Sequence, residues 1–379
     1  MSGNAPTDQP QQAQSDAAAA TVTAKDAQRD ALLVPQGGTS LRLGPALRRA
    51  AGTNSLWVFA ILIVIVAAFA AAAHGRFDTS SNFRFIAIDS AVLLLLATGE
   101  TFVIITSGID LSVGSVLVFS GVIGAEVMLA LGGQTSAAGL PQPVGNAGTG
   151  AILVGLFTSL ASGFGWGLLN GVLIAKGKIP PLIVTLGSYG AALGLAQIIT
   201  GGVDVIGVSP ALTDTVGTGT LYGLPWLVII SVVVVIGAAA LLYTTRFGRH
   251  TFAVGSNAEA ARRSGVDVDG HLIRVYTLAG FLSGLAGFLS LARFSTTTLA
   301  GHSSDNLNAI AAVVIGGTSL FGGVGSLVGT VIGVLIPSTL LNGFTVIGVQ
   351  PFWESVAVAI VLVVAVYVDQ LRRRRARRQ

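Results

Sequence analysis

The chain has 379 residues, of which 52% are hydrophobic and only 10% are charged, a balance far from that of soluble globular proteins. Its formal net charge is +4, and it contains no cysteine, which excludes disulfides, thiolate metal ligands and cysteine nucleophiles. The composition therefore indicates a protein whose surroundings are lipid.

The N-terminal segment differs from the rest of the chain. Residues 1–48 are rich in Ala, Gln, Asp and Thr and hold few large apolar side chains, which predicts a disordered cytoplasmic tail. Arg48 and Arg49 then precede the first apolar run, Leu56 to Ala73. Ala71 to Ala73 also resemble the cleavage site of a signal peptide, but the long polar segment ahead of the run favours a retained helix.

Apolar runs of membrane-spanning length follow one another through the remaining chain. At a rise of about 1.5 Å per residue they match the roughly 30 Å hydrocarbon core of a bilayer. Backbone polar groups must be paired in lipid, and the alternation of a β-barrel is missing, so the spans must be helices. We predict an all-α, polytopic integral membrane protein with about ten transmembrane helices. The predicted spans are 55–73, 85–107, 113–131, 151–175, 179–200, 224–244, 271–292, 306–321, 326–342 and 352–368.

The basic residues predict which loops face the cytoplasm, because short cytoplasmic loops carry an excess of Lys and Arg. The loops 132–150 and 201–223 contain neither, and Arg76, Arg84 and Arg293 are scattered exceptions. The pattern predicts that both termini are cytoplasmic. The cytoplasmic basic residues are Lys176, Lys178, Arg246, Arg249, Arg262, Arg263 and, in a basic tail at 372–379, Arg372 to Arg378.

Glycines recur at four-residue spacing in several spans. Small residues on one helix face let two backbones approach closely, which favours helix packing in lipid. We therefore expect a compact helix bundle. The glycines concerned are Gly163, Gly167 and Gly171, Gly280 and Gly284, and Gly325, Gly329 and Gly333.

No residue pattern in the chain supports catalysis. The phosphate-binding loop of ATPases, Gly followed by four residues and Gly-Lys-Ser/Thr, is absent. The four histidines, at positions 74, 250, 271 and 302, lack the spacing of metal ligands. We expect no enzymatic activity, no metal site and no cofactor.

Ionisable residues within or beside the spans are costly to bury, so they face a cavity, a partner or the interface. Asp110 can accept hydrogen bonds from Ser112 or from free N–H groups and cap the helix that begins near Leu111; contact with a substrate or an ion, or pairing with another helix, are the alternatives. Glu100 suits either a proton-coupling carboxylate or a hydrogen bond between helices. The full set is Asp89, Glu100, Asp110, Glu126 and Glu354.

The longest and most charged cytoplasmic loop is Arg246 to Arg274. Within it Ser256 and Glu259 have the spacing of a capping box, a short helix is predicted from Ala258 to Ser264, and Gly265 is a natural stop. Physical reasoning leaves two roles open: a helix that docks in a groove on a partner protein, or a basic loop that rests on anionic headgroups.

Four motifs carry a resemblance to a known family: Gly99 to Ser115, Asn170 to Gly187, Gly255 to Gly265 and Ala309 to Ser326. Across residues 85–368 the chain resembles the permease of ribose, xylose and galactoside-type ATP-binding cassette (ABC) importers, the monosaccharide branch that includes autoinducer uptake systems. Any one motif is a weak signal, because glycine-rich apolar segments recur throughout membrane proteins. The four together are highly specific.

The resemblance implies a transmembrane permease domain at 49–371, with a coupling loop at 246–270 that a cleft in a separate ATPase subunit receives. It also implies a second permease copy, in a homodimer or heterodimer, and a periplasmic or lipid-anchored sugar-binding protein. Membrane lipid surrounds the chain, and no nucleic acid is involved. The residues expected to couple to the ATPase are Gly255, Asn257, Glu259, Ala260, Ala261, Arg262, Ser264 and Gly265.

The translocation path is less well defined by the sequence. In the family, selectivity lies mostly with the binding protein, so the path need not hold a tight site. The stretch Asp305-Asn306-Leu307-Asn308 departs from the family pattern, because amides stand where Glu and Asp are usual. Polar path candidates, which fit interhelical hydrogen bonds equally well, are Asp110, Asn170, Thr185, Tyr189 and Asn342.

The expected function is that of a non-catalytic permease subunit in a bacterial inner membrane. It would translocate a pentose, a hexose or a related small polar solute, driven by the separate ATPase. The alternatives are an ion-coupled secondary sugar transporter, which would show paired halves with interrupted helices, and a channel, which would show a repeated filter. The sequence gives little sign of repeats and no such filter.

Overall fold

The helices of this chain follow the apolar runs of its sequence. The structure is a computed structural model, and it describes residues 53–132, 148–206, 208–302 and 304–376. In chain order the elements are α3 (Thr53–Ala72), α4 (Ser80–Ile105), α5 (Val113–Gly132), α6 (Thr149–Ala175), α7 (Pro181–Thr200), α8 (Pro210–Leu212), η1 (Thr213–Gly217), β1 (Thr220–Leu221), β2 (Leu224–Pro225), α9 (Trp226–Thr244), α10 (Arg246–Ser256), α11 (Ala258–Arg263), α12 (Val268–Phe294), α13 (Asp305–Ile315), α14 (Leu327–Val346) and α15 (Trp353–Ala376).

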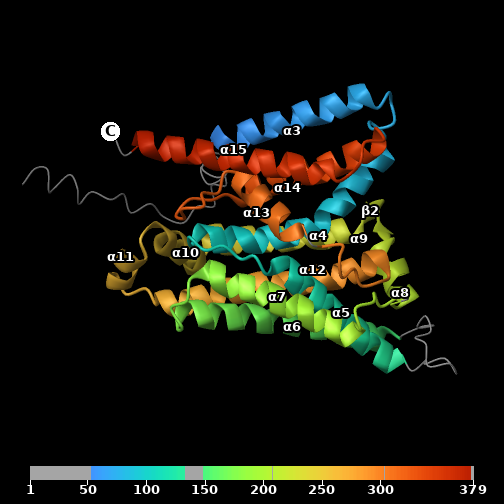
Figure 1. The fold of residues 1–379 in the computed structure, drawn as a ribbon, viewed down its shortest axis with the longest axis horizontal. Coiled ribbons are helices and arrows are strands. Elements are labelled where there is room, and N and C mark those ends of the chain that lie inside the picture. Colours follow the sequence, from blue (N-terminus) through green and yellow to red (C-terminus); the bar gives the residue numbers. More distant parts are fainter. Residues whose placement is uncertain (1–52, 133–147, 207, 303, 377–379) are drawn as a thin grey trace, which may run out of the picture. The chain divides into compact units, whose positions relative to one another are not determined.

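Every predicted span overlaps a helix, so the all-α polytopic fold is confirmed (Figure 1). Within the described residues, seven helices are long and apolar enough to cross a membrane. Three further helices contain shorter apolar stretches, at Trp57–Ala72, Asp305–Ile315 and Trp353–Val364. The short strands β1 and β2 pair antiparallel in a hairpin between η1 and α9.

The predicted span at 306–321 is wrong in extent, because α13 ends at Ile315. Gly317 has a φ of 93°, in the left-handed region where glycine is favoured and where helices end. The chain then forms a loop at 316–326 before α14 begins. A comparable loop, 106–112, joins α4 to α5, and both loops lie at the end of the bundle that carries α10 and α11. We call this the α11 end.

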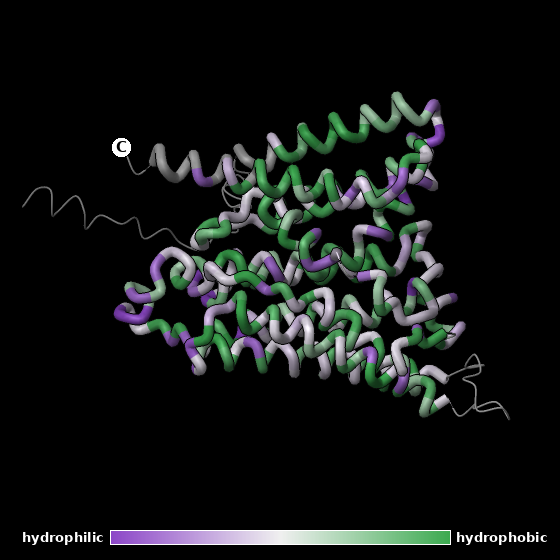
Figure 2. Tube along the Cα trace, in the orientation of Figure 1, coloured by the Kyte–Doolittle hydropathy of each residue, from purple (hydrophilic) through white to green (hydrophobic). Residues whose placement is uncertain are grey.

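The centre of the bundle is α4, which contacts α12, α13, α14 and α9. Its residues from Ser90 to Ile105 are buried without a break, as expected for a helix that is apolar on all faces. In contrast, α6, α7 and α9 turn large apolar side chains outward, and Phe157, Ile198 and Val233 are each more than half exposed. Outward apolar faces of this kind suit a lipid environment, and the long helices are largely hydrophobic along their length (Figure 2).

The glycine spacing corresponds to close helix packing, as predicted. A Cβ at Gly163 of α6 would lie 2.7 Å from the Cα of Gly284 on α12, closer than real Cβ atoms come. Gly167 faces Gly280 in the same contact, and α6 and α12 form the most extensive helix pair of the bundle. Gly329 of α14 meets Gly316 in the same way. Backbone contact therefore holds these helices together where side chains would keep them apart.

Parts of the predicted domain organisation fall outside the described residues. The predicted disordered tail at 1–48 is one of them, as are the last three residues of the predicted basic tail. Residues 372–376 of that tail continue α15. The predicted coupling loop at 246–270 comprises α10, α11 and the first turn of α12, whose N-cap residue Asp267 accepts a hydrogen bond from the N–H of Gly270 at 3.0 Å.

Candidate functional site

The α11 end of the bundle carries two short helices between α9 and α12. Thr245 caps α10, since its Oγ1 accepts a hydrogen bond from the N–H of Gly248 at 3.4 Å. Asn257 separates the helices and caps α11, its Oδ1 accepting from the N–H of Ala260 at 2.9 Å. Gly265 follows α11 with a φ of 85°. The predicted short helix with its glycine stop is confirmed.

The predicted capping box is wrong. Ser256 is the last residue of α10, and Asn257 occupies the N-cap position of α11 in its place. Glu259 does not reach back to the cap: it pairs with Arg263 one turn further along, at 3.1 Å between Oε1 and Nε. The sequence spacing alone could not decide whether Ser256 or Asn257 is the N-cap residue of α11, because Ser and Asn are both good N-cap residues.

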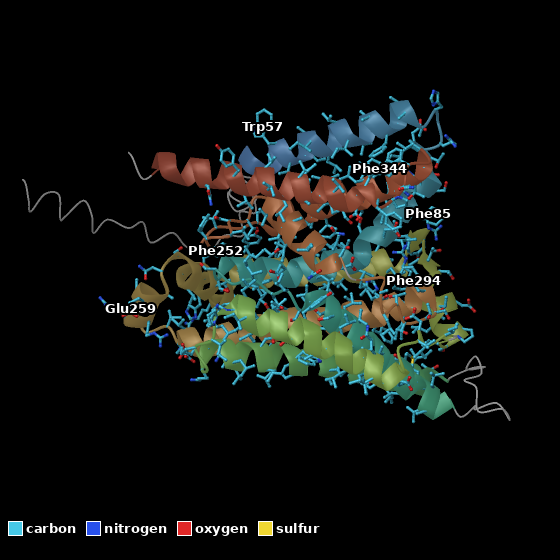
Figure 3. The ribbon with its side chains drawn as sticks, viewed as in Figure 1. Trp57, Phe85, Phe252, Glu259, Phe294 and Phe344 are labelled. Atoms are coloured by element: carbon cyan, nitrogen blue, oxygen red, sulfur yellow. The ribbon has the colours of Figure 1, made fainter. Side chains whose placement is uncertain are left out.

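A small apolar cluster fixes α11 to its neighbours. Ala261 is buried and packs with Val254 of α10 and Val268 of α12. Glu259 and Ala260 lie on the exposed side of the helix, and Glu259 is at the tip of the α11 end in Figure 3. Among the residues predicted to couple to a partner, Ala261 therefore holds the helix in place from within, while Glu259 and Ala260 are available for contact from outside.

Two basic groups share one carboxylate beside α11. Lys178, in the loop between α6 and α7, and Arg262 each lie 2.9 Å from Asp269 at the start of α12. The hydrogen bond to Asp269 raises the pKa of Arg262 above its ordinary value. Water screens exposed pairs such as these, so they orient α11 more than they stabilise the fold. They also bring two of the predicted basic loops to the same end of the bundle.

The end of α10 is joined to both loops of the α11 end through Gly255, in a contact that we call the Gly255 junction. The hydroxyl of Ser107 donates toward the carbonyls of Gly255, at 3.1 Å, and of Phe321, at 3.0 Å. The N–H of Gly323 donates to the carbonyl of Ile105 at 2.9 Å. The loops 106–112 and 316–326 are thus bonded to each other and to the helix that leads into α11.

Only glycine fits at the centre of this junction. A Cβ at Gly255 would overlap the carbonyl oxygen of Ile105 and lie 2.7 Å from the N–H nitrogen of Gly323. Both are backbone atoms, so no side-chain rotation relieves the overlap. Any movement of α11 that carries the end of α10 with it must therefore displace the two loops directly.

A chain of buried, hydrogen-bonded polar side chains extends from loop 106–112 into the bundle. The N–H of Asp110 donates to Oε1 of Glu100 at 3.1 Å, and Oδ1 of Asp110 accepts from the N–H of Ser112 at 2.8 Å. Asn170 of α6 donates to the Ser112 hydroxyl at 2.9 Å and accepts from Ser188 of α7. We call these five residues the buried polar chain. It ties α4, the 106–112 loop, α6 and α7 together.

The predicted interaction between Asp110 and Ser112 is confirmed, although α5 begins at Val113 and not near Leu111. Of the other path candidates, Thr185 lies beside the buried polar chain and donates to the carbonyl of Ile109 at 3.3 Å. Tyr189 is half-buried on α7, and Asn342 lies apart on α14, with an Oδ1 that is buried and unpaired in the described part of the chain. Three of the five candidates therefore come together.

Sequence reasoning missed Ser107 and the second loop of the Gly255 junction. A signal was present, because Thr106-Ser107 precedes Val-Gly-Ser at 113–115, and Thr318-Ser319 precedes Val-Gly-Ser at 324–326. Each copy links a helix that ends at the α11 end to a helix that starts there. This short internal repeat marks the two loops that meet. In the described residues, no group of three or more His, Asp or Glu side chains is placed to hold a metal ion.

Comparisons with known proteins give a consistent result. Residues 82–366 match the family described as branched-chain amino acid transport system / permease component. The chain is 36% identical over 319 residues to the ribose import permease protein RbsC of Escherichia coli (strain K12), covering 83% of this chain and 92% of that protein.

Other relatives are named for different sugars. The D-allose transport system permease protein AlsC of Escherichia coli (strain K12) is 34% identical, over 83% of this chain and 90% of its own length. The fructose import permease protein FrcC of Rhizobium meliloti is 31% identical, over 82% and 83%. No solved structure matches the chain.

Proposed function

Because this chain belongs to the branched-chain amino acid transport system / permease component family, we propose that it is the membrane-spanning permease subunit of an ABC importer for a monosaccharide or a related small polar solute. The likeness to sugar permeases over more than four fifths of the chain carries this proposal. The relatives are named for different sugars, so the proposal covers both pentoses and hexoses.

The structure supports a coupling role for α11. A partner ATPase that closes on ATP does work on the permease only if it binds two permease conformations with different affinity. One face of α11 is exposed, and its opposite face is fixed to the bundle through buried Ala261. The adjoining Gly255 junction is hydrogen-bonded directly to the loops between transmembrane helices. Such a helix transmits displacement without taking part in chemistry, so ATP hydrolysis belongs to the partner.

The proposed assembly has a second permease copy, identical or related, two ATPase domains and a solute-binding protein. The α11 end faces the cytoplasm in this arrangement, since Lys178, Arg246, Arg249, Arg262 and Arg263 all belong to that end. Both termini are then cytoplasmic, in the inner membrane of a bacterium. The binding protein meets the opposite end, where η1 and the β1–β2 hairpin lie.

Reconstituted vesicles test the proposed function directly. Uptake of radiolabelled D-ribose, D-allose, D-fructose or D-xylose is measured with the permease, its ATPase and its binding protein, with and without ATP. The proposal expects uptake of at least one sugar that needs both the ATPase and ATP. Uptake by the permease alone, driven by a proton or sodium gradient, would instead establish the secondary transporter.

Reversing one charge on α11 is expected to uncouple the complex. The Glu259→Arg variant removes the pair with Arg263 and places two like charges on the exposed face, and we expect uptake per ATP hydrolysed to fall about fivefold or more, a loss of about 1 kcal/mol in contact energy. Transport and hydrolysis are measured in the same vesicles. The control is Asp78→Arg, an exposed acidic residue in the turn between α3 and α4, which belongs neither to α11 nor to the η1 and β1–β2 segments. Equal ratios in the two variants would contradict docking at α11.

A further inference from the structure

A cavity of about 220 Å³ with polar and apolar walls lies among five helices toward the end of the bundle opposite α11. It is smaller than the roughly 300 Å³ at which sites for drug-sized ligands begin, so it fits a small solute. Phe294, at the end of α12 in Figure 3, lines it together with apolar residues of α4 and α14. Its polar lining consists of Asp89, Arg293, His302, Asp305, Asn308 and Glu354, together with Ser338.

The polar groups at the cavity form three bonded pairs, of which two join different helices and the third is local to the start of α13. Arg293 of α12 forms an ion pair with Asp89 of α4. Asn308 of α13 donates to Oε1 of Glu354 on α15 at 3.0 Å. In the third pair, Nδ1 of His302 lies 2.7 Å from Oδ2 of Asp305. A guanidinium has five N–H donors and a carboxylate about four acceptor positions, so each pair keeps hydrogen-bonding capacity toward the cavity.

Charge narrows the class of solute. Three carboxyl groups stand against the single guanidinium of Arg293, so a phosphate or carboxylate in the cavity is repelled. The lining holds both donors, on Arg293 and Asn308, and carboxylate acceptors, which suits a neutral molecule that carries several hydroxyl groups. Pairing between helices explains the bonds of Arg293 with Asp89 and of Asn308 with Glu354 but not the open volume beside them, since helix contacts in membranes are close-packed.

Two backbone features beside the cavity recur at binding sites within membranes, a proline inside a helix and a helix of about half length. Pro337, which lines the cavity, lies inside α14 and removes one backbone hydrogen bond there. The short helix α13 begins at Asp305 beside the same space. Interrupted and half-length helices occur where irregular backbone borders a cavity. The 305–308 stretch, whose amides depart from the family pattern, thus contributes two of its four residues to the lining.

We propose that this cavity binds a neutral monosaccharide as it enters the permease from the end opposite α11, an inference that rests on the proposed import of sugars. Ring hydroxyls donate to Asp89, Asp305 and Glu354 and accept from Arg293 and Asn308, while Phe294 covers an apolar face of the ring. The cavity receives the sugar that the binding protein releases, and it rejects phosphorylated sugars by charge.

The absence of cysteine from the chain makes a clean labelling test available. A Ser338→Cys variant places one thiol in the cavity wall, and a Leu221→Cys variant places one on the exposed β1 strand as the matched control. Each is labelled in membrane vesicles with a cationic methanethiosulfonate reagent, without binding protein, in the presence of D-ribose, D-xylose, D-allose, D-fructose or D-ribose 5-phosphate. Leaving out the binding protein keeps its own affinity from masking that of the cavity.

The proposal expects one of the neutral sugars to slow labelling of the Ser338→Cys variant about fivefold at about four times its dissociation constant, because only the unoccupied site reacts. D-ribose 5-phosphate and the Leu221→Cys control should show no protection. Adding Glu354→Gln, which keeps the shape but removes the charge, should raise the half-protecting concentration about threefold to tenfold.

The outcome also separates this inference from the proposed function. If ATP-driven uptake of a sugar proceeds in the same vesicles but no sugar protects the Ser338→Cys thiol, the cavity is not the site, and the importer stands. Equal protection by the phosphate ester would overturn the charge argument and the proposal with it. If no sugar is taken up with ATPase, ATP and binding protein present, the proposed function fails, and this inference fails with it.

Discussion

Replacing Gly255 with alanine is expected to lower sugar uptake per ATP hydrolysed by about tenfold to hundredfold. The added Cβ would overlap the Ile105 carbonyl and crowd the Gly323 nitrogen, so the end of α10 must move away from both loops. Overpacking against backbone typically costs about 1–3 kcal/mol, which corresponds to the stated change in coupling. The measurement is uptake and ATP hydrolysis in the same reconstituted vesicles.

A matched control for this change is Gly237→Ala on α9, where an added Cβ meets no atom within 4 Å. It adds the same methyl group to a helix and should leave the coupling ratio unaltered. Folding is followed separately by size-exclusion chromatography and melting temperature. An unchanged ratio in the Gly255→Ala variant, or a loss of uptake that only follows loss of folded protein, would contradict a transmitting role for the Gly255 junction.

The Gly163→Val variant is expected to destabilise the bundle more than any other single change considered for this chain. Valine on α6 would force its β-carbon into the backbone of Gly280 and Gly284 on α12. No side chain there can give way, so the two most extensively packed helices must separate, and the free energy of unfolding should fall by about 3 kcal/mol or more. Thermal unfolding of the purified protein in detergent or nanodiscs measures the effect.

Gly165→Val is the control for this second change. It lies two residues away on the same helix, on the exposed side, with nothing within 4 Å of an added Cβ. Helix propensity changes equally in the two variants, so the difference between their melting temperatures reports the α6–α12 contact alone. Melting temperatures that fall by the same amount would show that the contact tolerates a side chain.

The sequence predicted those features that local pattern determines. Span positions follow from runs of apolar residues, because burial of the backbone in lipid requires a continuous helix. The glycine stop of α11 followed from a backbone conformation that other residues avoid. Where two residues are equally suited to one role, as Ser256 and Asn257 are, local pattern named the wrong one. The early end of α13 at Ile315 was also missed, since no charged residue follows the helix to mark its end.

The features that the sequence did not predict depend on residues far apart in the chain. Ser107 and Gly255 are 148 positions apart, and Arg293 and Asp89 are 204 apart. Each partner by itself looks ordinary: a serine after a helix, or a single charge beside a span. Which of them meet depends on how the helices are arranged around α4, and periodicity says nothing about that arrangement. The recurrence of Thr-Ser and Val-Gly-Ser in both loops was the one available clue to the Gly255 junction.

The hydroxyl of Ser107 has a single hydrogen, yet two carbonyl oxygens lie at almost equal distances from it. A lone donor cannot satisfy two acceptors in full, so each carbonyl holds only a share of that bond. If the neighbouring segments part, the hydroxyl can swing to either oxygen and recover a full bond there. The hydrogen bond of Ser107 can therefore pass from one carbonyl to the other with little net change in enthalpy, which suits a contact that the proposed coupling movement would shift.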